Sequence, residues 1–389
     1  MKDGFVKVAA VTPDIRVADV AYNTQNICKM IDETVAKGAK VIVFPELCVT
    51  GYTCSDLFTQ DILLKESKEA LFKIAEYTTE KDAIIFIGVP LAIDGELYNV
   101  AAALNHGEIL GLTTKTFLPN YGEFYEMRQF RPGPDKARWI TLDGKQILFG
   151  PQLLFVADQM EELVISAEIC EDVWSPVPPS TLAAREGATV IVNCSASDET
   201  IGKASYRESL IEGQSARLIC GYIYANAGEG ESTTDLVFGG HNIIAENGTT
   251  LVSSDRFTNE VIYTELDVKH LLSERRKNTT FQTEKERMLI RIPFSIHVEE
   301  TELTRKFASR PFVPSVMAER NLRCEEILTI QAMGLKKRLA HAHAKSAVVG
   351  ISGGLDSTLA LLVSAKAFDA LGMDRSGITA VTMPCFGTT

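Results

Sequence analysis

From Phe5 onward, apolar runs alternate with longer stretches of helical period, and this alternation limits the folds open to the chain more than any other feature. FVKVAAVTP and KVIVFPE are predicted strands, and residues 17–36 between them are a predicted amphipathic helix. Further strands are predicted at ELVISAEIC, TVIVNCSAS and YIYANAG, and NHG is a predicted turn. Such alternation is typical of an α/β or a layered α+β domain.

The chain is predicted to hold two units joined by a linker. Residues 1–276 form the first unit, and residues 277–320 lose the period and collect polar, charged and proline residues. Residues 321–389 begin the second unit, in which SAVVGIS, STLALLVSAKAF and GITAVTMP predict a strand, a helix and a strand. Because a parallel sheet of two strands is not a stable domain, we expect a C-terminally truncated protein.

Composition argues against several classes of protein. The chain has 389 residues, 46 % of them hydrophobic and 23 % charged, and no apolar run is long enough to span a bilayer. The start, MKDGFVKVAA, lacks the regions of a signal peptide, so we expect a cytoplasmic protein with no membrane partner. A net charge of −12 argues against nucleic acid as a partner. Eight cysteines without a CxxC pair argue against structural zinc, which leaves small molecules as the expected partners.

EICEDVW, residues 168–174, places Cys170 among three acidic residues at a strand-to-loop transition. A single cysteine is more often part of a core than a nucleophile. No histidine shares a papain or caspase motif with a cysteine, so a nucleophile here needs another base. Glu46 and Lys115 each follow a predicted strand, and strand ends at one edge of an α/β sheet converge. We therefore expect Glu46, Lys115 and Cys170 to meet.

FPELCVTGY, KTFLPNYGEFYEMRQFRPG and EICEDVW, in this order, resemble the three catalytic blocks of the nitrilase superfamily. The resemblance implies a four-layer α-β-β-α sandwich and a triad of Glu46, Lys115 and Cys170 that cleaves amides or nitriles through a thioester. Glu46 would accept the thiol proton and Lys115 would stabilise the developing oxyanion, aided by the backbone N–H of Glu171. Glu123 matches the family's second glutamate, which holds the lysine. Taken singly, each of these charged residues would be better explained as a cap, a solvated strand end or a surface ion pair.

NCSASDETIGKASYRES and YANAGEGESTTDLVFGGHNIIAENG resemble the branch that supplies the glutaminase domain of glutamine-dependent NAD synthetases. The resemblance implies a pocket for L-glutamine made by Tyr52, Tyr121, Phe124, Glu126, Glu171, Ser197 and Lys203. At the position of Lys203 we expect arginine in some relatives, so a bidentate carboxylate clamp becomes a single charged contact here. Glu168 and Asp172 are expected to be structural, and either paired or facing solvent.

GISGGLDS, residues 350–357, allows several interpretations. A G-x-S-x-G nucleophile elbow fails because no histidine follows, and a Walker A loop fails because no Gly-Lys-Ser/Thr closes it. A structural glycine turn stays open, and phosphate binding is the other alternative. For that alternative the expected ATP site comprises Gly350, Ile351, Ser352, Gly353, Gly354, Leu355, Asp356 and Ser357. Two glycines would let the backbone approach an anion at a helix N-terminus, and Asp356 indicates a bridging Mg²⁺.

This loop is similar to the SGGxDS loop of the ATP pyrophosphatase group, and MPCFGTT resembles the segment that follows it, which implies the start of a Rossmann-like domain. Together the two resemblances imply glutamine-dependent NAD synthesis. The second domain would adenylate deamido-NAD with ATP and Mg²⁺, and ammonia released from glutamine would reach it through an internal tunnel. The protein would form a homo-oligomer, for which an octamer is one arrangement. This chain alone is expected to perform only the glutaminase half. A stand-alone nitrilase-family amidase with a vestigial nucleotide loop, and a non-catalytic scaffold module, stay open.

Overall fold

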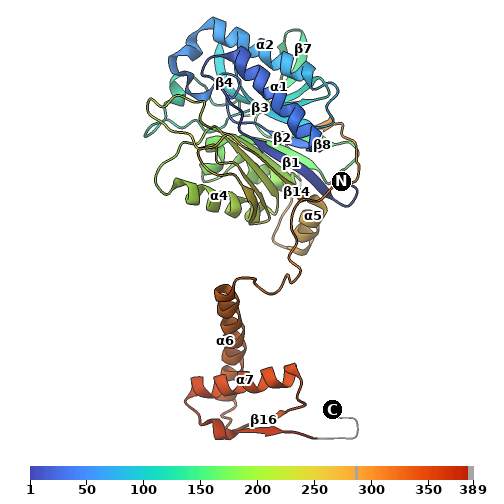
Figure 1. Cartoon of the computed structure of the whole chain (residues 1–389), viewed down its shortest axis with the longest axis vertical. Coiled ribbons are helices and arrows are strands. Elements are labelled where there is room, and N and C mark those ends of the chain that lie inside the picture. Colours follow the sequence, from blue (N-terminus) through green and yellow to red (C-terminus); the bar gives the residue numbers. More distant parts are fainter. Residues whose placement is uncertain (285–287, 384–389) are drawn as a thin grey trace. The chain divides into compact units, whose positions relative to one another are not determined.

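The computed structural model describes residues 1–284 and 288–383 and divides the chain into two compact units, Met1–Arg305 and Lys306–Thr389 (Figure 1). The predicted boundaries at residues 276 and 320 stay a prediction, although strand β15 (Ile290–Phe294) lies inside the segment predicted as a linker. Of the MPCFGTT segment, residues 384–389 lie outside the described residues.

The first sheet of the first unit has eight strands among the described residues. In spatial order they are β14 (Val261–Asp267), β1 (Phe5–Val11), β2 (Val41–Val43), β3 (Ile84–Ile93), β4 (Glu96–Asn105), β5 (Glu108–Thr114), β7 (Lys145–Gly150) and β6 (Arg138–Leu142). The hairpin between β4 and β5 turns at His106 and Gly107, both with positive φ, so the predicted NHG turn is confirmed.

The second sheet has seven strands in the described part of the chain. They follow in the order β13 (Thr249–Ser253), β12 (Ile243–Glu246), β11 (Gly221–Asn226), β10 (Val190–Ser195), β9 (Val164–Ile169), β8 (Leu153–Ala157) and β15. β9, β10 and β11 pair in parallel and are buried along their whole length, which explains their continuous apolar sequences. β15 completes the edge of the sheet beside β8.

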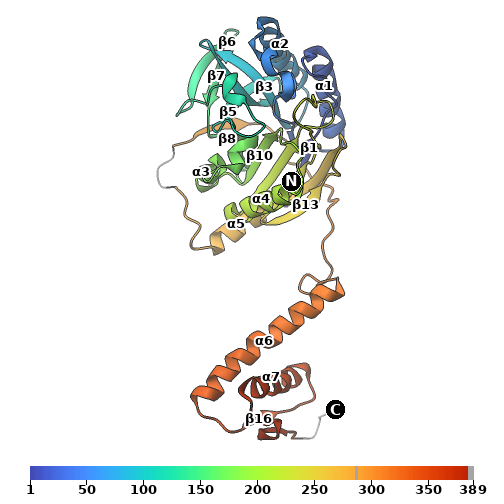
Figure 2. The same cartoon turned by 90° about the vertical axis from the view of Figure 1, so that its left-hand side faces the viewer.

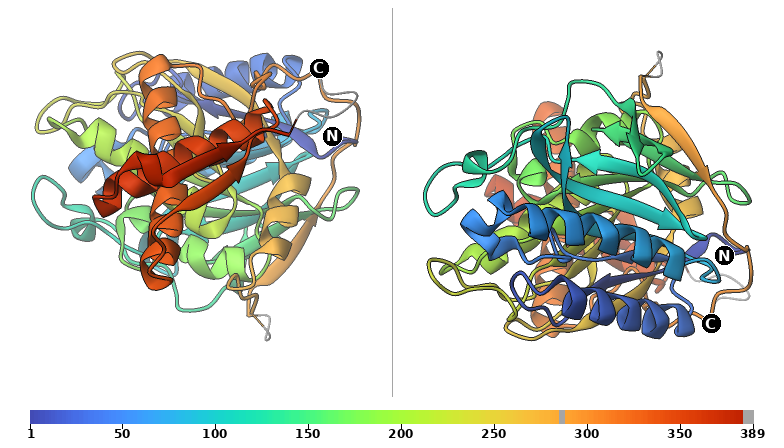
Figure 3. Two further views of the ribbon diagram at one scale, coloured as in Figure 1. Left: turned by 90° about the horizontal axis from the view of Figure 1, so that it is seen from below. Right: turned by 90° about the horizontal axis from the view of Figure 1, so that it is seen from above.

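The two sheets form the inner layers of a four-layer α-β-β-α sandwich, as the resemblance to the nitrilase superfamily implied (Figures 1 and 2). Helices α1 (Val20–Ala36) and α2 (Asp61–Tyr77) lie side by side on the outer face of the first sheet (Figure 3). Helices α3 (Pro179–Arg185) and α4 (Lys203–Leu218) cover the second sheet, and α5 (Val268–Lys277) follows β14. Apolar side chains fill the space between the sheets, where the rings of Phe86 and Phe155 meet edge to face at 5.5 Å.

The second unit contains the predicted strand, helix and strand. β16 (Ala347–Gly350) pairs in parallel with β17 (Ile378–Val381), and α7 (Leu355–Leu371) connects them before a short turn, η4 (Arg375–Gly377). Helix α6 (Met317–His341) packs on α7 through an apolar cluster that includes Ala332, Val363 and Ala367. Among the described helices of both units, none combines the length and apolarity needed to cross a membrane.

Candidate active site

Glu46 lies just beyond β2, and its side chain is fully buried. Its Oε1 accepts hydrogen bonds from Lys115 Nζ and from Asn99 Nδ2, both at 2.6 Å. Its Oε2 accepts the backbone N–H of Ala196 at 3.0 Å. Donors therefore hold both carboxylate oxygens, so the orientation of this buried acid is fixed.

The segment that carries Glu46 crosses β3 at Gly88 with no room for a side chain. A Cβ at Gly88 would lie 2.2 Å from the backbone N of Leu47 and 2.4 Å from the backbone O of Pro45. These neighbours are backbone atoms and cannot rotate aside. Glycine at this position therefore allows the close approach that places Glu46 in the site.

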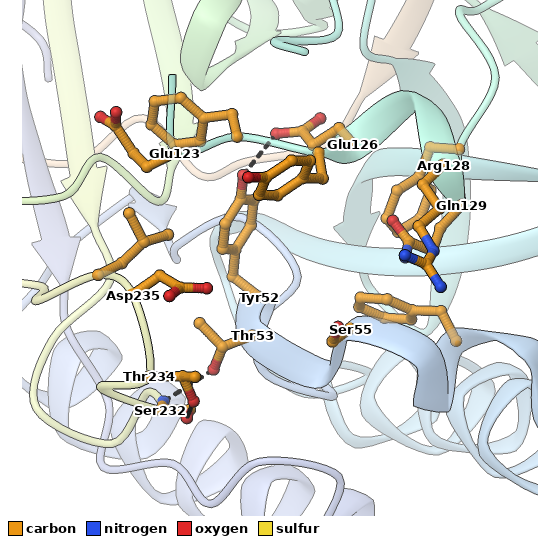
Figure 4. Close-up of a pocket in the computed structure, with 15 residues that line it drawn as sticks. Tyr52, Thr53, Ser55, Glu123, Glu126, Arg128, Gln129, Ser232, Thr234 and Asp235 are labelled. Carbon is orange, nitrogen blue, oxygen red and sulfur yellow. Dashed lines mark hydrogen bonds between the residues drawn. The ribbon is translucent and has the colours of Figure 1, made fainter. Parts of the chain in front are cut away.

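Lys115 follows β5, and its Nζ lies 2.6 Å from Oε1 of both Glu46 and Glu126. Burial alone would lower the pKa of Lys115, but Glu126, Glu46 and Cys170 raise it well above its ordinary value. Burial also raises the pKa of Glu126, and Lys115 opposes that rise. The Tyr52 hydroxyl donates to the same Glu126 oxygen at 2.8 Å (Figure 4). The site thus contains a permanent ammonium group shared by two buried carboxylates.

The carboxylate that holds Lys115 together with Glu46 is Glu126, and this corrects the expectation that Glu123 has that role. Glu126 opens the short helix η2 (Glu126–Arg128) and is only 5 % exposed. Glu123 lies on the turn before η2 and is exposed, and within the described residues no ion pair joins it to Lys115. Both residues line the cavity, but η2 directs the carboxylate of Glu126 inward to Lys115, whereas that of Glu123 is exposed (Figure 4).

Cys170 begins the short helix η3 (Cys170–Trp174) directly after β9 and is buried. Its φ of 40° is left-handed, which is uncommon for a residue other than glycine. Its backbone N–H donates to Asn193 Oδ1 at 2.9 Å. Burial raises the pKa of the Cys170 thiol, Glu46 raises it further and Lys115 opposes the change. The resting thiol is therefore protonated, and a neighbouring base has to remove its proton.

Asp172 is buried beside Cys170 and is fully paired. Its Oδ1 accepts the backbone N–H groups of Thr116 at 3.0 Å and Phe117 at 2.9 Å. Its Oδ2 accepts the backbone N–H of Ile169 at 2.9 Å. The expectation of a paired carboxylate at this position is confirmed.

The other two acids of EICEDVW point elsewhere. Glu168 is buried and accepts hydrogen bonds from the Tyr222 hydroxyl and the backbone N–H of Ser180. Glu171 is partly exposed and accepts the Tyr121 hydroxyl at 2.6 Å. Glu168 is therefore paired as expected, and Glu171 contacts Tyr121, the residue assigned with it to the predicted glutamine pocket.

A cavity of about 220 Å³ adjoins the buried acids (Figure 4). Its walls include Tyr52, Phe124 and Glu126 of the predicted glutamine pocket, whereas Cys170 is not among the lining residues. Glu46 and Lys115 do not line it either, but Glu126 belongs to the cavity wall and also contacts Lys115, so this carboxylate lies between the cavity and the triad.

Lys203 and Ser197 lie at the start of α4 and in the loop before it. Lys203 Nζ forms an ion pair with Asp198 and lies 5.4 Å from the ring centroid of Phe124 and 5.6 Å from that of Trp174. Ser197 is buried, and its Oγ accepts a hydrogen bond from Arg207. The structure therefore brings Lys203 to the pocket residue Phe124, and Trp174 joins it there.

Two polar side chains within strands orient the triad and were not predicted from the sequence. Asn99 in β4 binds Glu46, and Asn193 in β10 binds the backbone of Cys170. The available signal was an asparagine within a largely apolar, buried run, since a buried amide needs a partner.

The predicted nucleotide loop connects β16 to α7 and is exposed for most of its length. Gly353 has a φ of 84°, which explains a glycine there, and Gly354 caps α7. Ser357 Oγ donates to the backbone O of Gly354 at 3.0 Å. Asp356 lies in the first turn of α7, and in the described part of the chain no three His, Cys, Asp or Glu side chains gather as a metal site.

The sequence pattern of the carbon-nitrogen hydrolase family matches residues 7–276, and that of NAD synthase matches residues 327–389. A glutamine-dependent NAD(+) synthetase of Mycobacterium leprae is 40 % identical over 395 residues, which cover 99 % of this chain and 58 % of that protein. The corresponding protein of Aquifex aeolicus is 31 % identical, over 95 % of this chain and 59 % of its own length. The chain thus spans less than two thirds of these relatives.

Solved structures share the fold. A glutamine-dependent NAD(+) synthetase from Cytophaga hutchinsonii aligns with a TM-score of 0.61 at 23 % identity, covering 99 % of this chain and 61 % of that chain. An amidase of the nitrilase superfamily from Nesterenkonia aligns with a TM-score of 0.53 at 21 % identity, covering 70 % of this chain and 94 % of its own. The first unit therefore has the nitrilase-type sandwich predicted from the sequence.

Proposed function

Because the chain belongs to the carbon-nitrogen hydrolase family, we propose that its first unit hydrolyses the side-chain amide of L-glutamine through Cys170 and releases ammonia. The observation that carries this proposal is the buried ammonium of Lys115, held 2.6 Å from both Glu46 and Glu126 beside the Cys170 thiol. A protonated thiol needs a base for attack, and the developing oxyanion needs a cation. Glu46 and Lys115 supply these two groups.

The proposed reaction has two steps. Cys170 Sγ attacks the amide carbon while Glu46 takes the thiol proton, and Lys115 stabilises the oxyanion. Glu46 then returns the proton to the amide nitrogen, ammonia leaves and a thioester remains. Water, deprotonated by Glu46, cleaves the thioester, so that glutamate departs and the thiol regains its proton.

The glutamine pocket is proposed at the cavity beside Glu126. The second oxygen of Glu126 is buried without a hydrogen-bond partner among the described residues, so it is free to accept an N–H of the substrate amide. Tyr52 and Phe124 form apolar walls, and Glu171 with Tyr121 faces the substrate ammonium. Ser197 and Lys203 bind the α-carboxylate, for which Lys203 must share its charge with Asp198.

For a protein as long as the relatives, we propose that the ammonia amidates deamido-NAD in a reaction driven by ATP, giving NAD, AMP and pyrophosphate. Residues 350–357 would bind the ATP phosphates at the start of α7. Mg²⁺ keeps several waters and takes few protein ligands, so the exposed carboxylate of Asp356 fits it together with phosphate oxygens, whose charge the metal would neutralise. A homo-oligomer, with an octamer as one arrangement, stays part of this proposal.

The proposal is tested by measuring ammonia release from glutamine with wild-type protein and with Cys170→Ala. We expect wild-type turnover and a loss of at least about 10³-fold in the variant, because the nucleophile is absent. Cys324→Ala, which removes an exposed cysteine on α6, is the matched control. Unchanged release in Cys170→Ala would show the triad to be misassigned. Release from simple amides but not from glutamine would favour a general amidase.

A further inference from the structure

Lys115 and Cys170 come from different sheets, since β5 lies in the first and β9 in the second. Their spacing therefore depends on a connection between the sheets. We propose that Asp172 is a positioning residue that fixes Lys115 relative to Cys170. This inference rests on the proposed function, because it concerns how the same triad is assembled.

The three hydrogen bonds of Asp172 carry the inference. Oδ1 accepts from Thr116 and Phe117, the two residues that directly follow Lys115, and Oδ2 accepts from Ile169, which directly precedes Cys170. One carboxylate, 1 % exposed, thus joins the backbone beside the lysine to the backbone beside the nucleophile. Burial raises the pKa of Asp172 to about 8, and the hydrogen bonds from the backbone N–H groups of Ile169 and Phe117 oppose this rise because they favour the ionised carboxylate. Bonds to that ionised carboxylate from backbone N–H groups are short and strong, and here little water competes for them.

The backbone at Cys170 needs such support. A left-handed cysteine at the start of η3 adopts a conformation that its own side chain disfavours. Asn193 holds the Cys170 N–H, but it belongs to β10 and so fixes the cysteine only within the second sheet. Asp172 binds the backbone N–H of Ile169, just before Cys170, and also the backbone N–H groups of Thr116 and Phe117 in the loop after β5. It supplies the link to the first sheet that Asn193 does not.

Loss of this link displaces Lys115 from the sulfur and from the oxyanion. Asp172→Asn keeps the size of the side chain, but its amide NH₂ meets backbone N–H donors where an oxygen accepted before. A misplacement of about 1 Å in a catalytic group lowers the rate about 100-fold, so kcat for glutamine should fall by about that factor. KM should stay within about threefold, because none of the three partners of Asp172 belongs to the proposed glutamine pocket.

Glu265→Gln is the matched control. Glu265 is fully buried and, like Asp172, accepts two backbone N–H groups in sequence, those of Thr304 and Arg305, so it undergoes the same carboxylate-to-amide change. It also accepts the Thr304 hydroxyl and lies 3.7 Å from Lys7 Nζ. Its partners lie outside the triad and the proposed pocket. Both variants should melt below wild type, but only Asp172→Asn should lose kcat per folded molecule. Asp172→Glu, which keeps the charge but lengthens the side chain, provides a second variant if Asp172→Asn does not fold.

Alkylation of Cys170 by iodoacetamide at pH 8, followed by mass spectrometry, gives a readout independent of glutamine. Since Lys115 favours the thiolate, its displacement should slow alkylation at least about fivefold in Asp172→Asn or Asp172→Glu, and not in Glu265→Gln. If the Asp172 variants and Glu265→Gln have the same kcat and the same alkylation rate, the positioning role is overturned. Turnover of glutamine by the wild type would in that case still support the proposed function. A wild type without glutamine turnover, but with alkylation slowed only in the Asp172 variants, would retain the positioning role and refute the glutaminase.

Discussion

Replacement of Lys115 by methionine tests the electrostatic centre of the site. Methionine is close to lysine in length and fills the same space, but it removes the ammonium group that lies 2.6 Å from Glu46 and from Glu126. Both carboxylates are buried, and the single substitution removes the cation that they share.

The expected loss of stability follows from these distances. A pair of unit charges at this separation attracts by about 6 kcal/mol at an effective dielectric of about 20. Desolvation offsets much of this attraction, and removal of one partner of a buried pair lowers the free energy of unfolding by about 3–5 kcal/mol. For a domain of this size that corresponds to a melting temperature lower by about 6–10 °C. Glutamine hydrolysis should fall at least about 100-fold, because the oxyanion loses its cation.

The loss of stability in Lys115→Met should also depend on pH. Burial raises the pKa of Glu126 and Lys115 opposes this, so without Lys115 the pKa rises further above its value in the unfolded chain. A carboxyl group with a raised pKa in the folded state binds its proton more tightly there. The stability it provides is fully present below the unfolded pKa and is lost as pH rises through the folded pKa. The difference in melting temperature from wild type should therefore be small at pH 5 and larger at pH 8.

Differential scanning fluorimetry at both pH values measures this difference, and Lys40→Met is the matched control. Lys40 is also buried, with its side chain 8 % exposed, and bridges two carboxylates, Asp82 at 2.5 Å and Glu299 at 2.6 Å, but these partner side chains are 28 % and 62 % exposed. Water reaches both carboxylates once the ammonium group is gone, so the loss should be close to the about 0–1 kcal/mol of solvent-exposed pairs, and this control should melt within about 2 °C of wild type. Equal losses in the two variants, or a Lys115→Met deficit that does not grow with pH, would refute the reasoning.

Three further predictions concern the same site. Because burial raises the pKa of Cys170, its alkylation rate should still increase above about pH 10, where that of a cysteine in an unfolded peptide, with a pKa of about 8.5, has levelled off; a plateau shared by both thiols would contradict the buried, protonated cysteine. Gly88→Ala should lower glutamine hydrolysis at least about 100-fold by displacing Glu46, whereas Gly213→Ala in α4, where a Cβ meets no atom within 4 Å, should have no effect on activity. Lys203→Met should raise KM for glutamine about tenfold or more with kcat little changed, and Lys203→Arg should restore binding; a change in kcat alone would place the residue outside the carboxylate site.

Much of the first unit could be predicted from local sequence, because buried parallel strands leave continuous apolar runs and tight turns require residues such as NHG. The contact of Glu126 with Lys115 was not predicted, since spacing along a loop does not reveal which carboxylate a short helix turns inward. β15 was not predicted as a strand because it contains an arginine and a proline, which an edge strand tolerates. Asn99 and Asn193 act through partners that are distant in sequence, and only the packed sheets reveal them.

The origin of the triad from two sheets has a consequence for folding. Glu46 and Lys115 follow strands of one sheet, and Cys170 follows a strand of the other. During refolding, each sheet can complete its own hydrogen bonds while no catalytic site yet exists. Circular dichroism would then follow the formation of strands, and recovery of turnover would follow their docking face to face. The interval between the two signals would time the closure of the inner core.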